Sequence, residues 1–545
     1  MVVRLLAVTS VAILAVAAMS AQPGPHTEVF ATSDQCMACH NSLRAPSGED
    51  VSIGASWRAS MMANSARDPY WQAGVRREVL DHPASAEMIQ DECAACHMPM
   101  SRTEARLNGK SGAVFDHLRA GAGGDRSDRL AHDGVACSLC HQITDQGFGT
   151  PASFTGGYVV APPSAPPVRR RSSEQGRPVF GPFKIEQGLT TIMKSATGFQ
   201  PTEGLHVRQS ELCATCHTLV TKALGARGEV IGELPEQMPF QEWQHSAYAG
   251  EERSCQSCHM PVVEDETPIA SVLGAPRKGL ARHTFVGGNF FMQRLLNRYR
   301  DELGVVSPAA ELEASIDVTL ANLQKSTAEL SIEHAERTGR RLVADVRVRN
   351  LTGHKLPTGY PSRRSWLHVT VRDRDGRAVF ESGALAASGA IAGNDNDAAT
   401  TGVEPHYAEI RAGDQVQIYE SVMGDVSGRP TTGLLSAVKY LKDNRLLPRG
   451  FDKTSAEPSI GVVGSAQQDA DFGGGGDLVR YAVEVDEAAG PFRFEVELRF
   501  QVIGFRWADN LRAYKSEETS RFVGYYDSMS SSSSEVLAAA REIVK

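Results

Sequence analysis

The chain has 545 residues, enough for about two to four domains of ordinary size. Hydrophobic residues make up 41% and charged residues 22%, which excludes both wholesale disorder and a polytopic membrane protein. The 56 basic and 65 acidic side chains leave a net charge of −9, with no long run of one sign. A nucleic-acid partner is therefore not expected, because it would require a basic face.

The first 21 residues have the pattern of a secretory signal peptide. Arg4 precedes an apolar stretch from Leu5 to Ala18, and small residues follow at Ser20 and Ala21. The stretch is short for a bilayer span of about 20 residues, although an uncleaved anchor helix is the alternative. No later segment is as long and apolar, so we expect no integral membrane segment in the mature chain. We expect an exported protein, either periplasmic or at the cell surface and beyond.

All ten cysteines fall in five Cys-x-x-Cys pairs, and a histidine follows each pair directly. The motifs, numbered one to five, are Cys36, Cys39 and His40; Cys93, Cys96 and His97; Cys137, Cys140 and His141; Cys213, Cys216 and His217; Cys255, Cys258 and His259. Two thiols at this spacing can add to the vinyl groups of a haem, and the adjacent histidine then ligates the iron. Zinc sites, thioredoxin-like dithiols and disulfides are the alternatives, but none of them requires the trailing histidines. The sequence therefore predicts five covalently bound haem c groups.

The motifs follow one another closely along the chain. Their first cysteines lie 57, 44, 76 and 42 residues apart. Such intervals leave little polypeptide for a separate core around each haem, so we expect the haems to pack together and supply much of the apolar interior. Short helices should carry the motifs, with long loops between them. Closely packed haems suit multi-step electron transfer.

A low-potential electron-transfer haem takes a second axial side chain. Sixteen histidines, five of them in the motifs, leave eleven for that role. The candidates with the most informative sequence context are His132, His206, His245 and His283, then His117 and His354. His26, near the processed terminus, and His82, before a proline, are weaker candidates. Met61 and Met62 offer a different ligand, although core-filling methionines are the simpler interpretation.

The flanks of the motifs also carry recurring words. They include Asp-Gly-Val-Ala-Cys-Ser-Leu-Cys-His, Leu-Cys-Ala-Thr-Cys-His-Thr, Cys-Gln-Ser-Cys-His-Met-Pro and Trp-x-x-Ser, within roughly residues 30 to 290. In these features the chain resembles the multihaem c-type cytochromes of the nitrifier tetrahaem electron-transfer type. The resemblance implies a periplasmic protein with stacked, mostly bis-histidine haems. In relatives a distal histidine often lies two residues after the Trp-x-x-Ser serine, where this chain has Met62, and five motifs rather than four is a second departure.

From about residue 310 the chain lacks cysteine and shows two-residue periodicity broken by turn signals. Apolar and charged residues alternate over 492–502, which predicts a half-buried strand, and further strands are expected at 342–349, 367–372 and 479–485. Their irregular connections favour a β-sandwich. The expected fold class is α + β multidomain, with a mostly helical and loop-rich cytochrome domain before an all-β, sandwich-like domain. The expected boundaries are signal peptide 1–21, pentahaem domain 22–305, β domain 306–528, and a Ser-rich segment with a terminal helix or tail at 529–545.

Two loops of the β domain carry candidate ligands. Residues 350–361 contain two glycines and two prolines, which predicts a shaped loop between strands. His354 in this loop either reaches a haem and fastens the domains together, or is a structural histidine. Residues 393–397 offer side-chain oxygens to calcium but lack the later glutamate, so a polar turn is the simpler interpretation. His368 lies on the polar face of its strand and is expected to be solvated.

These features predict an exported pentahaem c-type cytochrome that carries out multi-step electron transfer between redox partners. The β domain is a candidate surface for docking or oligomer formation. The alternative is a multihaem oxidoreductase in which one open-coordination haem acts on a small nitrogen or sulfur compound. No Gly-rich nucleotide loop or nucleophile elbow indicates another catalytic centre, and no catalytic side chain is assigned.

Overall fold

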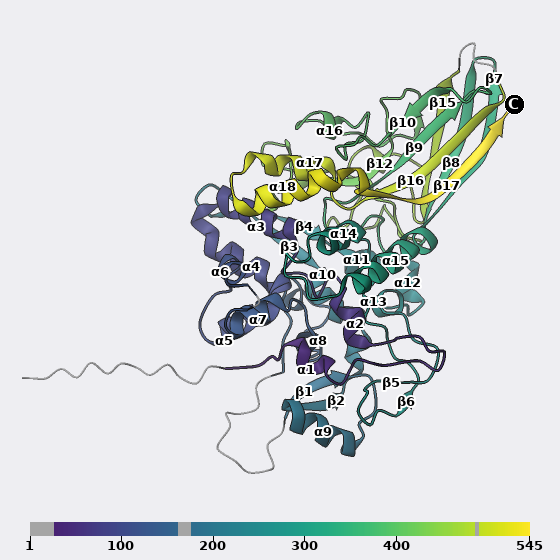
Figure 1. The fold of residues 1–545 in the computed structure, drawn as a ribbon. Helices are drawn as coiled ribbons and strands as arrows, with labels where there is room; N and C mark the ends of the chain where they lie inside the picture. Colours follow the sequence, from purple (N-terminus) through teal and green to yellow (C-terminus); the bar gives the residue numbers. More distant parts are fainter. Residues whose placement is uncertain (1–26, 122, 162–175, 486–489) are drawn as a thin grey trace, which may run out of the picture.

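The computed structural model describes residues 27–121, 123–161, 176–485 and 490–545. The expected signal peptide and His26 lie outside these residues. Helices dominate up to residue 305, which we call the motif half, and strands dominate from residue 306, which we call the β half (Figure 1). The presence of both a helical and a sheet region confirms the α + β class.

The motif half is built from short helices. They are α1 (Ser33–Met37), α2 (Ile53–Arg58), α3 (Pro69–Asp81), α4 (Ala86–His97), α5 (Pro99–Leu107), α6 (Phe115–Ala120), α7 (Arg126–His132), α8 (Cys137–Cys140), α9 (Gln187–Thr197), α10 (Ser210–His217), α11 (Pro239–Gln244), α12 (Ala247–Gly250), α13 (Cys255–His259) and α14 (Phe290–Arg298). The five motifs lie on or at the end of α1, α4, α8, α10 and α13. Helix α3 begins where Asp68 accepts hydrogen bonds from the backbone N–H groups of Tyr70 and Trp71, with Pro69 in the first turn.

Three small sheets and three 3₁₀ turns are also found among the described residues of this half. The parallel pair is β1 (Arg177–Gly181) and β2 (Phe199–Glu203), and the antiparallel pairs are β3 (Leu219–Leu224) with β4 (Val230–Gln237) and β5 (Thr267–Pro268) with β6 (Pro276–Arg277). The 3₁₀ turns span Pro83–Ser85, Pro151–Ser153 and Leu205–Arg208. These strands were not expected from the sequence.

The β half begins with helix α15 (Ala309–Ser326) and then forms two sheets that face each other. The four-stranded sheet contains β7 (Ala328–Thr338), β8 (Arg341–Asn350), β11 (Glu409–Ile410) and β15 (Gly476–Glu484). The seven-stranded sheet contains β9 (Arg364–Arg372), β10 (Ala378–Ser382), β12 (Ile418–Gly424), β13 (Pro430–Thr431), β14 (Lys439–Asp443), β16 (Phe492–Gln501) and β17 (Ser534–Val544). Its main order is β13-β12-β9-β16-β17, with β10 beside β9 and β14 beside β12.

Alternation along the strands explains this packing. In β16 the apolar residues Phe492, Phe494, Val496 and Leu498 are at most 1% exposed, while the residues between them are exposed or half-buried. Tyr481 of β15 meets Phe494 across the sandwich, with ring centroids 5.8 Å apart. The strands expected at 342–349, 367–372, 479–485 and 492–502 are all present.

The C-terminal segment differs from expectation. We predicted a terminal helix or tail, but residues 534–544 form β17, antiparallel to β16 over its whole length. The Ala-rich composition favours a helix locally, yet pairing with β16 and burial of Leu537 and Val544 outweigh that preference. The preceding serines are ordered as well, since Ser530–Ser532 form a 3₁₀ turn and Ser533 is fully buried.

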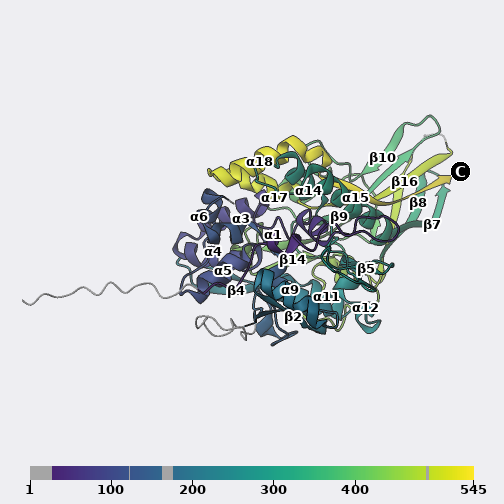
Figure 2. The same ribbon diagram turned by 60° about the horizontal axis from the view of Figure 1, so that its bottom comes forward.

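The two halves share one hydrophobic core. It contains Phe291 and Leu295 of α14 together with the inward residues of β8, β9, β15 and β16. Helices α16 (Asp395–Ala398), α17 (Phe505–Asn510) and α18 (Glu517–Met529) follow or interrupt the strands, with 3₁₀ turns at Leu434–Ser436, Ser465–Gln467 and Leu511–Ala513. Helix α18 returns to the motif half and packs along α3 (Figures 1 and 2). The boundary at residue 305 stays a prediction.

None of the helices among the described residues is both long enough and apolar enough to span a bilayer.

Candidate haem-binding sites

Four of the five motif histidines are held in one orientation by the backbone. Their Nδ1 atoms donate to carbonyl oxygens: His40 to Ile269 (2.6 Å), His97 to Ser65 (2.9 Å), His141 to Phe180 (2.5 Å), and His259 to Val286. A carbonyl oxygen can only accept, so the ring proton lies on Nδ1. The lone pair on Nε2 is then free for a metal, with the ring fixed from behind as in other histidine ligands.

The five motifs lie close to one another. Close thiol–thiol interactions join Cys36 to Cys137, Cys96 to Cys216, and Cys213 to Cys255. Electrostatic interaction also links the Cys140 thiol to Cys216. The contacts therefore connect motif one to three, three to four, four to five, and four to two. Every motif belongs to this single connected set.

Two non-motif histidines lie opposite motif histidines. The ring centroids of His283 and His141 are 6.3 Å apart with planes inclined by 22°, and those of His354 and His259 are 6.3 Å apart at 17°. An imidazole nitrogen lies about 2 Å from a metal that it ligates, so two rings that share one ion have centroids about 6 Å apart. Each pair therefore has the spacing of two imidazole rings that share one iron.

Four histidines, two from the motifs and two from outside them, have the protonation state that metal binding requires. Burial lowers the pKa of His97, His217, His283 and His354 to about 4, so each ring is neutral at physiological pH. A histidine must be neutral to offer its lone pair. The Nδ1 atoms of His283 and His354 donate to the carbonyl oxygens of Ala281 and Lys355, both at 2.9 Å, which leaves Nε2 available in each ring.

His354 comes from the β half, and its loop is clamped to the motif half by Glu242 of α11. The Glu242 carboxylate is fully buried and accepts from the backbone N–H of Lys355 (3.1 Å) and from the Thr358 hydroxyl (2.5 Å). Two points of the loop are thus tied to one side chain. The clamp fixes where the loop brings His354.

A buried ion network extends this clamp. The Lys355 ammonium is fully buried and donates to Asp443 Oδ2 at 2.8 Å, and Asp443 also binds Arg445 at 2.7 Å. Arg445 in turn lies 3.0 Å from Glu242. The two cations hold the pKa of Asp443 well below its usual range against the opposing effect of burial. Sequence reasoning missed this network, because nothing in the spacing of the four residues shows that they meet.

The remaining candidates lie opposite no motif histidine in the described parts of the chain. His206 and His132 use Nε2 to donate to the carbonyl oxygens of Ile143 (2.9 Å) and His117 (3.0 Å), which leaves only Nδ1 for a metal. The His117 ring forms a 2.7 Å contact with Asp128. His245 donates from Nδ1 to the carbonyl of Gln241 at 2.8 Å and keeps Nε2 available. Their role as axial ligands stays a prediction.

Three motif histidines, His40, His97 and His217, have no second imidazole at the 6.3 Å spacing among the described residues. The flat face of His97 is instead covered by Trp71 of α3, with centroids 4.4 Å apart and planes inclined by 3°. Met61 packs against the shared core, in keeping with a core-filling role. The sequence offered no sign of Trp71, which lies far from any motif along the chain.

Residues 393–397 belong to a capped turn, in keeping with the polar-turn interpretation rather than a calcium loop. Residues 395–398 form the one-turn helix α16, and the Asn394 side chain accepts from the backbone N–H of Asn396. The Asp397 carboxylate is buried in an ion pair with Arg364 at 2.8 Å. His368 is half-buried rather than fully solvated, and it lies between Glu381 (3.0 Å) and Glu497 (3.5 Å).

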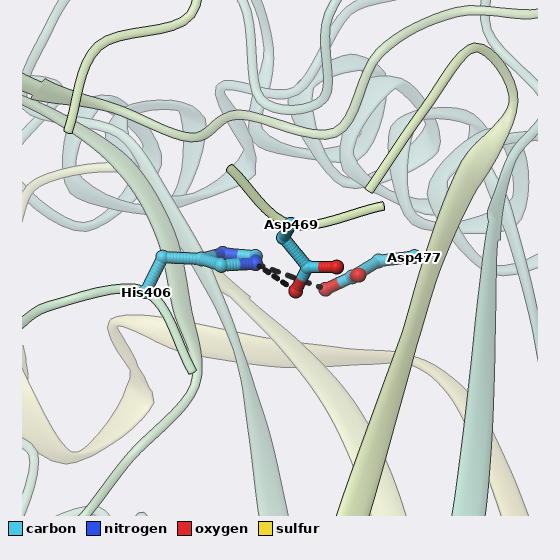
Figure 3. Close-up of side chains that lie close together, drawn as sticks. All are labelled: His406, Asp469 and Asp477. Carbon is cyan, nitrogen blue, oxygen red and sulfur yellow. Dashed lines mark hydrogen bonds and ion pairs between the residues drawn. The ribbon is translucent and has the colours of Figure 1, made fainter. Parts of the chain in front are cut away.

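A separate cluster in the β half contains His406, Asp469 and Asp477, whose ligand atoms lie within 4.8 Å of one another. Figure 3 shows both carboxylates turned toward the ring, with Asp469 Oδ2 3.1 Å from His406 Nε2. Burial, with the charge of Asp469, raises the pKa of Asp477 to about 7.

The hydrogen bonds around His406 are already satisfied on both sides of the ring. The Gln417 and Asn444 amides donate to Nδ1 at 2.8 and 3.0 Å, and the oxygens of both amides accept from backbone N–H groups. These partners place the ring proton on Nε2, where it is donated to Asp469. The cluster is therefore a hydrogen-bonded pair of His406 and Asp469 with Asp477 beside it, and we assign it no metal.

Comparison with known proteins finds one solved structure with a similar architecture. No protein-family model and no curated protein matches the chain. A search of solved structures finds a penta-heme cytochrome c552 from Thermochromatium tepidum, with a TM-score of 0.50 and 16% sequence identity. The match covers 94% of this chain and 98% of that one, so it includes the β half. The chain shares that protein's fold.

Proposed function

We propose that the chain is an exported pentahaem c-type cytochrome that transfers electrons between redox partners. The observation that carries this proposal is the connected set of thiol contacts, which brings all five motifs together although they span some 220 residues of sequence. The structural neighbour is a penta-heme cytochrome, which supports the same cofactor for this chain. When bound, each haem supplies a one-electron redox couple.

The chain's own residues set the properties of these sites. The ten motif cysteines would hold the haems covalently, and each motif histidine would supply one ligand to an iron. His283 and His354 would supply a second ligand at the third and fifth motifs, and bis-histidine ligation favours low potentials. The backbone carbonyls behind His40, His97, His141 and His259 fix the rings and raise their basicity.

The thiol contacts also suggest a route for electrons between the motifs. Motifs one, three, four and five are linked in that order by thiol interactions, and motif two is linked to motif four. Cys258 of motif five is exposed, whereas the other nine cysteines are half-buried. We therefore place one docking site for a redox partner next to motif five. Export to the periplasm and oligomer formation through the β half belong to the same proposal.

The experiment is a haem count followed by a redox titration. Intact mass and haem-to-protein ratio should give five haems, and stepwise chemical reduction should take up five electrons reversibly. Addition of half the required reductant should leave the electrons distributed over several haems within the mixing time of a stopped-flow instrument. Fewer than five haems, or reduction that stays confined to one haem, would contradict the proposal.

The alternative function, a multihaem oxidoreductase for a small nitrogen or sulfur compound, has one specific observation in its favour. His217 of motif four has no imidazole opposite it among the described residues, and the positively charged, half-buried side chain of Arg363 lies nearby. The reduced protein should be reoxidised by nitrite or hydroxylamine faster than by air if this function holds.

A further inference from the structure

Arg363 carries a charge that no carboxylate of the described residues balances. It lies at the end of the loop that carries His354, where its Nη1 donates to the carbonyl oxygen of Thr358 at 2.8 Å. Its neighbour Arg364 pairs with Asp397 at 2.8 Å, and Arg445 pairs with Asp443 at 2.7 Å. Arg363 has no comparable ion pair within the part of the chain that the structure describes, and the Thr358 carbonyl is its hydrogen-bond partner there.

The position of Arg363 makes this unusual. Burial lowers the pKa of its guanidinium to about 10, and no described carboxylate offsets that effect. Part of the side chain is nonetheless accessible, so a small group can reach it. Removing a cation from water is unfavourable unless an anion accompanies it, and a guanidinium remains charged at any physiological pH.

The surroundings of Arg363 show where such an anion would lie. Burial lowers the pKa of His217 and His354, and the charge of Arg363 lowers both further, so the guanidinium is near both rings. His217 belongs to motif four, and His354 lies opposite the histidine of motif five. Arg363 therefore lies near both motifs, and Thr358 is the hydrogen-bond partner of its guanidinium among the described residues.

We infer that Arg363 binds an oxyanion of the carboxylate type between motifs four and five. A guanidinium offers two parallel N–H groups, which match the two oxygens of a planar anion. Two sources supply that chemistry: a propionate of a haem held by motif four or five, or a small free oxyanion such as nitrite. The inference rests on the proposed function, because the propionate source requires haems at these motifs.

The test compares R363Q and R363K with the matched control R372Q, which removes an arginine from the neighbouring strand β9 that lies 3.8 Å from Glu495. The haem count is measured first on all four proteins. Fewer than five haems in the wild type would contradict the proposed function, and this result is distinct from any result for Arg363. R363K keeps the charge without the planar fork, so it guards against a variant that fails to fold.

Two measurements then distinguish the sources. If the anion is a propionate, R363Q lowers the midpoint potential of one or two haems, R363K recovers part of the shift, and nitrite does not bind. If the anion is free, the wild type and R372Q bind nitrite in equilibrium dialysis, and R363Q weakens binding at least tenfold. Identical potentials and identical nitrite binding in R363Q and R372Q, with five haems in each, would overturn the inference.

Discussion

The β half and the motif half solve the same packing problem in different ways. The β half contributes most of the large shared core, in which its long strands bury alternate side chains almost completely. Away from that core, the described residues of the motif half form three small apolar clusters, and cysteine and histidine side chains lie between its short helices. The strands of the β half pack their apolar side chains against one another. The motif half is instead arranged around thiols and imidazoles suited to hold haem. The two halves thus differ in how much of their interior is apolar packing, although they share one large core.

The loop of His354 is where the two halves depend on each other. It belongs to the β half by sequence, yet it places an imidazole opposite His259 and is clamped by Glu242 of the motif half. The β half is therefore more than a docking surface, because it supplies a candidate ligand.

The largest expected effect is the loss of one haem from the motif half, with the β half left intact. Replacing both Cys255 and Cys258 with serine should remove one haem, because covalent attachment requires the motif thiols. The strands of the β half should remain, as measured by far-UV circular dichroism. Ser257→Ala, within the same motif, is the control and should keep all five haems. An unchanged haem-to-protein ratio in the double variant would contradict the assignment of motif five.

A second substitution tests the joint between the halves. Asp443→Asn leaves Lys355 and Arg445 with one fewer anion, and loss of one partner from a buried ion pair costs about 3–5 kcal/mol. Denaturant unfolding should show this loss. Asp425→Asn breaks a more exposed pair with Arg429 and should cost under about 1 kcal/mol. Equal stabilities for the two variants would show that the network does not hold the joint.

A third test compares the interior of the β half with the interior of the motif half, by one substitution in each. Leu498 of β16 is fully buried, so Leu498→Ala should cost about 2–5 kcal/mol and leave the visible haem spectrum unchanged. Leu139, between the cysteines of motif three, is equally buried, and Leu139→Ala should alter the spectrum or the potential of a haem. If Leu498→Ala changed the haem spectrum as much as Leu139→Ala, the two interiors would not be distinct.

The smallest expected effect concerns a buried carboxyl of the motif half. Burial raises the pKa of Glu236 from 4.5 to about 7, although the Thr221 hydroxyl and the Gln237 amide both donate to it. Between these values the unfolded chain has lost the proton while the folded chain keeps it, so stability falls as pH rises from 4.5 to 7.

Removing this carboxyl should flatten the pH dependence. Glu236→Gln should lose less stability than the wild type between about pH 5 and pH 7, by about 2 kcal/mol at roughly 1.36 kcal/mol per pKa unit. Thermal unfolding at both pH values measures the difference. Parallel curves for the two proteins would mean that Glu236 is already ionised in the folded state at the lower pH.

Much of this architecture is readable from the sequence, for physical reasons. The motifs are local, so Cys255, Cys258 and His259 can be recognised from spacing alone, and the alternation in residues 492–502 reports burial of one strand face. The glycines and prolines of residues 350–361 indicate a shaped loop, and it joins β8 to β9 as expected. Local pattern suffices wherever the chemistry is local.

The rest depends on contacts between distant residues. Nothing in the sequence distinguishes His283 and His354 from His132 and His206, because only the fold decides which ring lies opposite a motif histidine. The strand β17 was missed for the same reason, since its Ala-rich sequence favours a helix until β16 pairs with it. The unbalanced charge of Arg363 becomes visible only when its surroundings are known.

The most direct test of the central claim is the low-temperature EPR spectrum of the oxidised His354→Ala variant, with haem content measured on the same sample. The control is His334→Ala, an exposed histidine of the same half. We expect five haems in both, with one low-spin ferric signal replaced by a high-spin signal in His354→Ala alone, and restored by added imidazole. An unchanged low-spin spectrum in His354→Ala would contradict the account, because it would show that the β half does not ligate the iron held by His259.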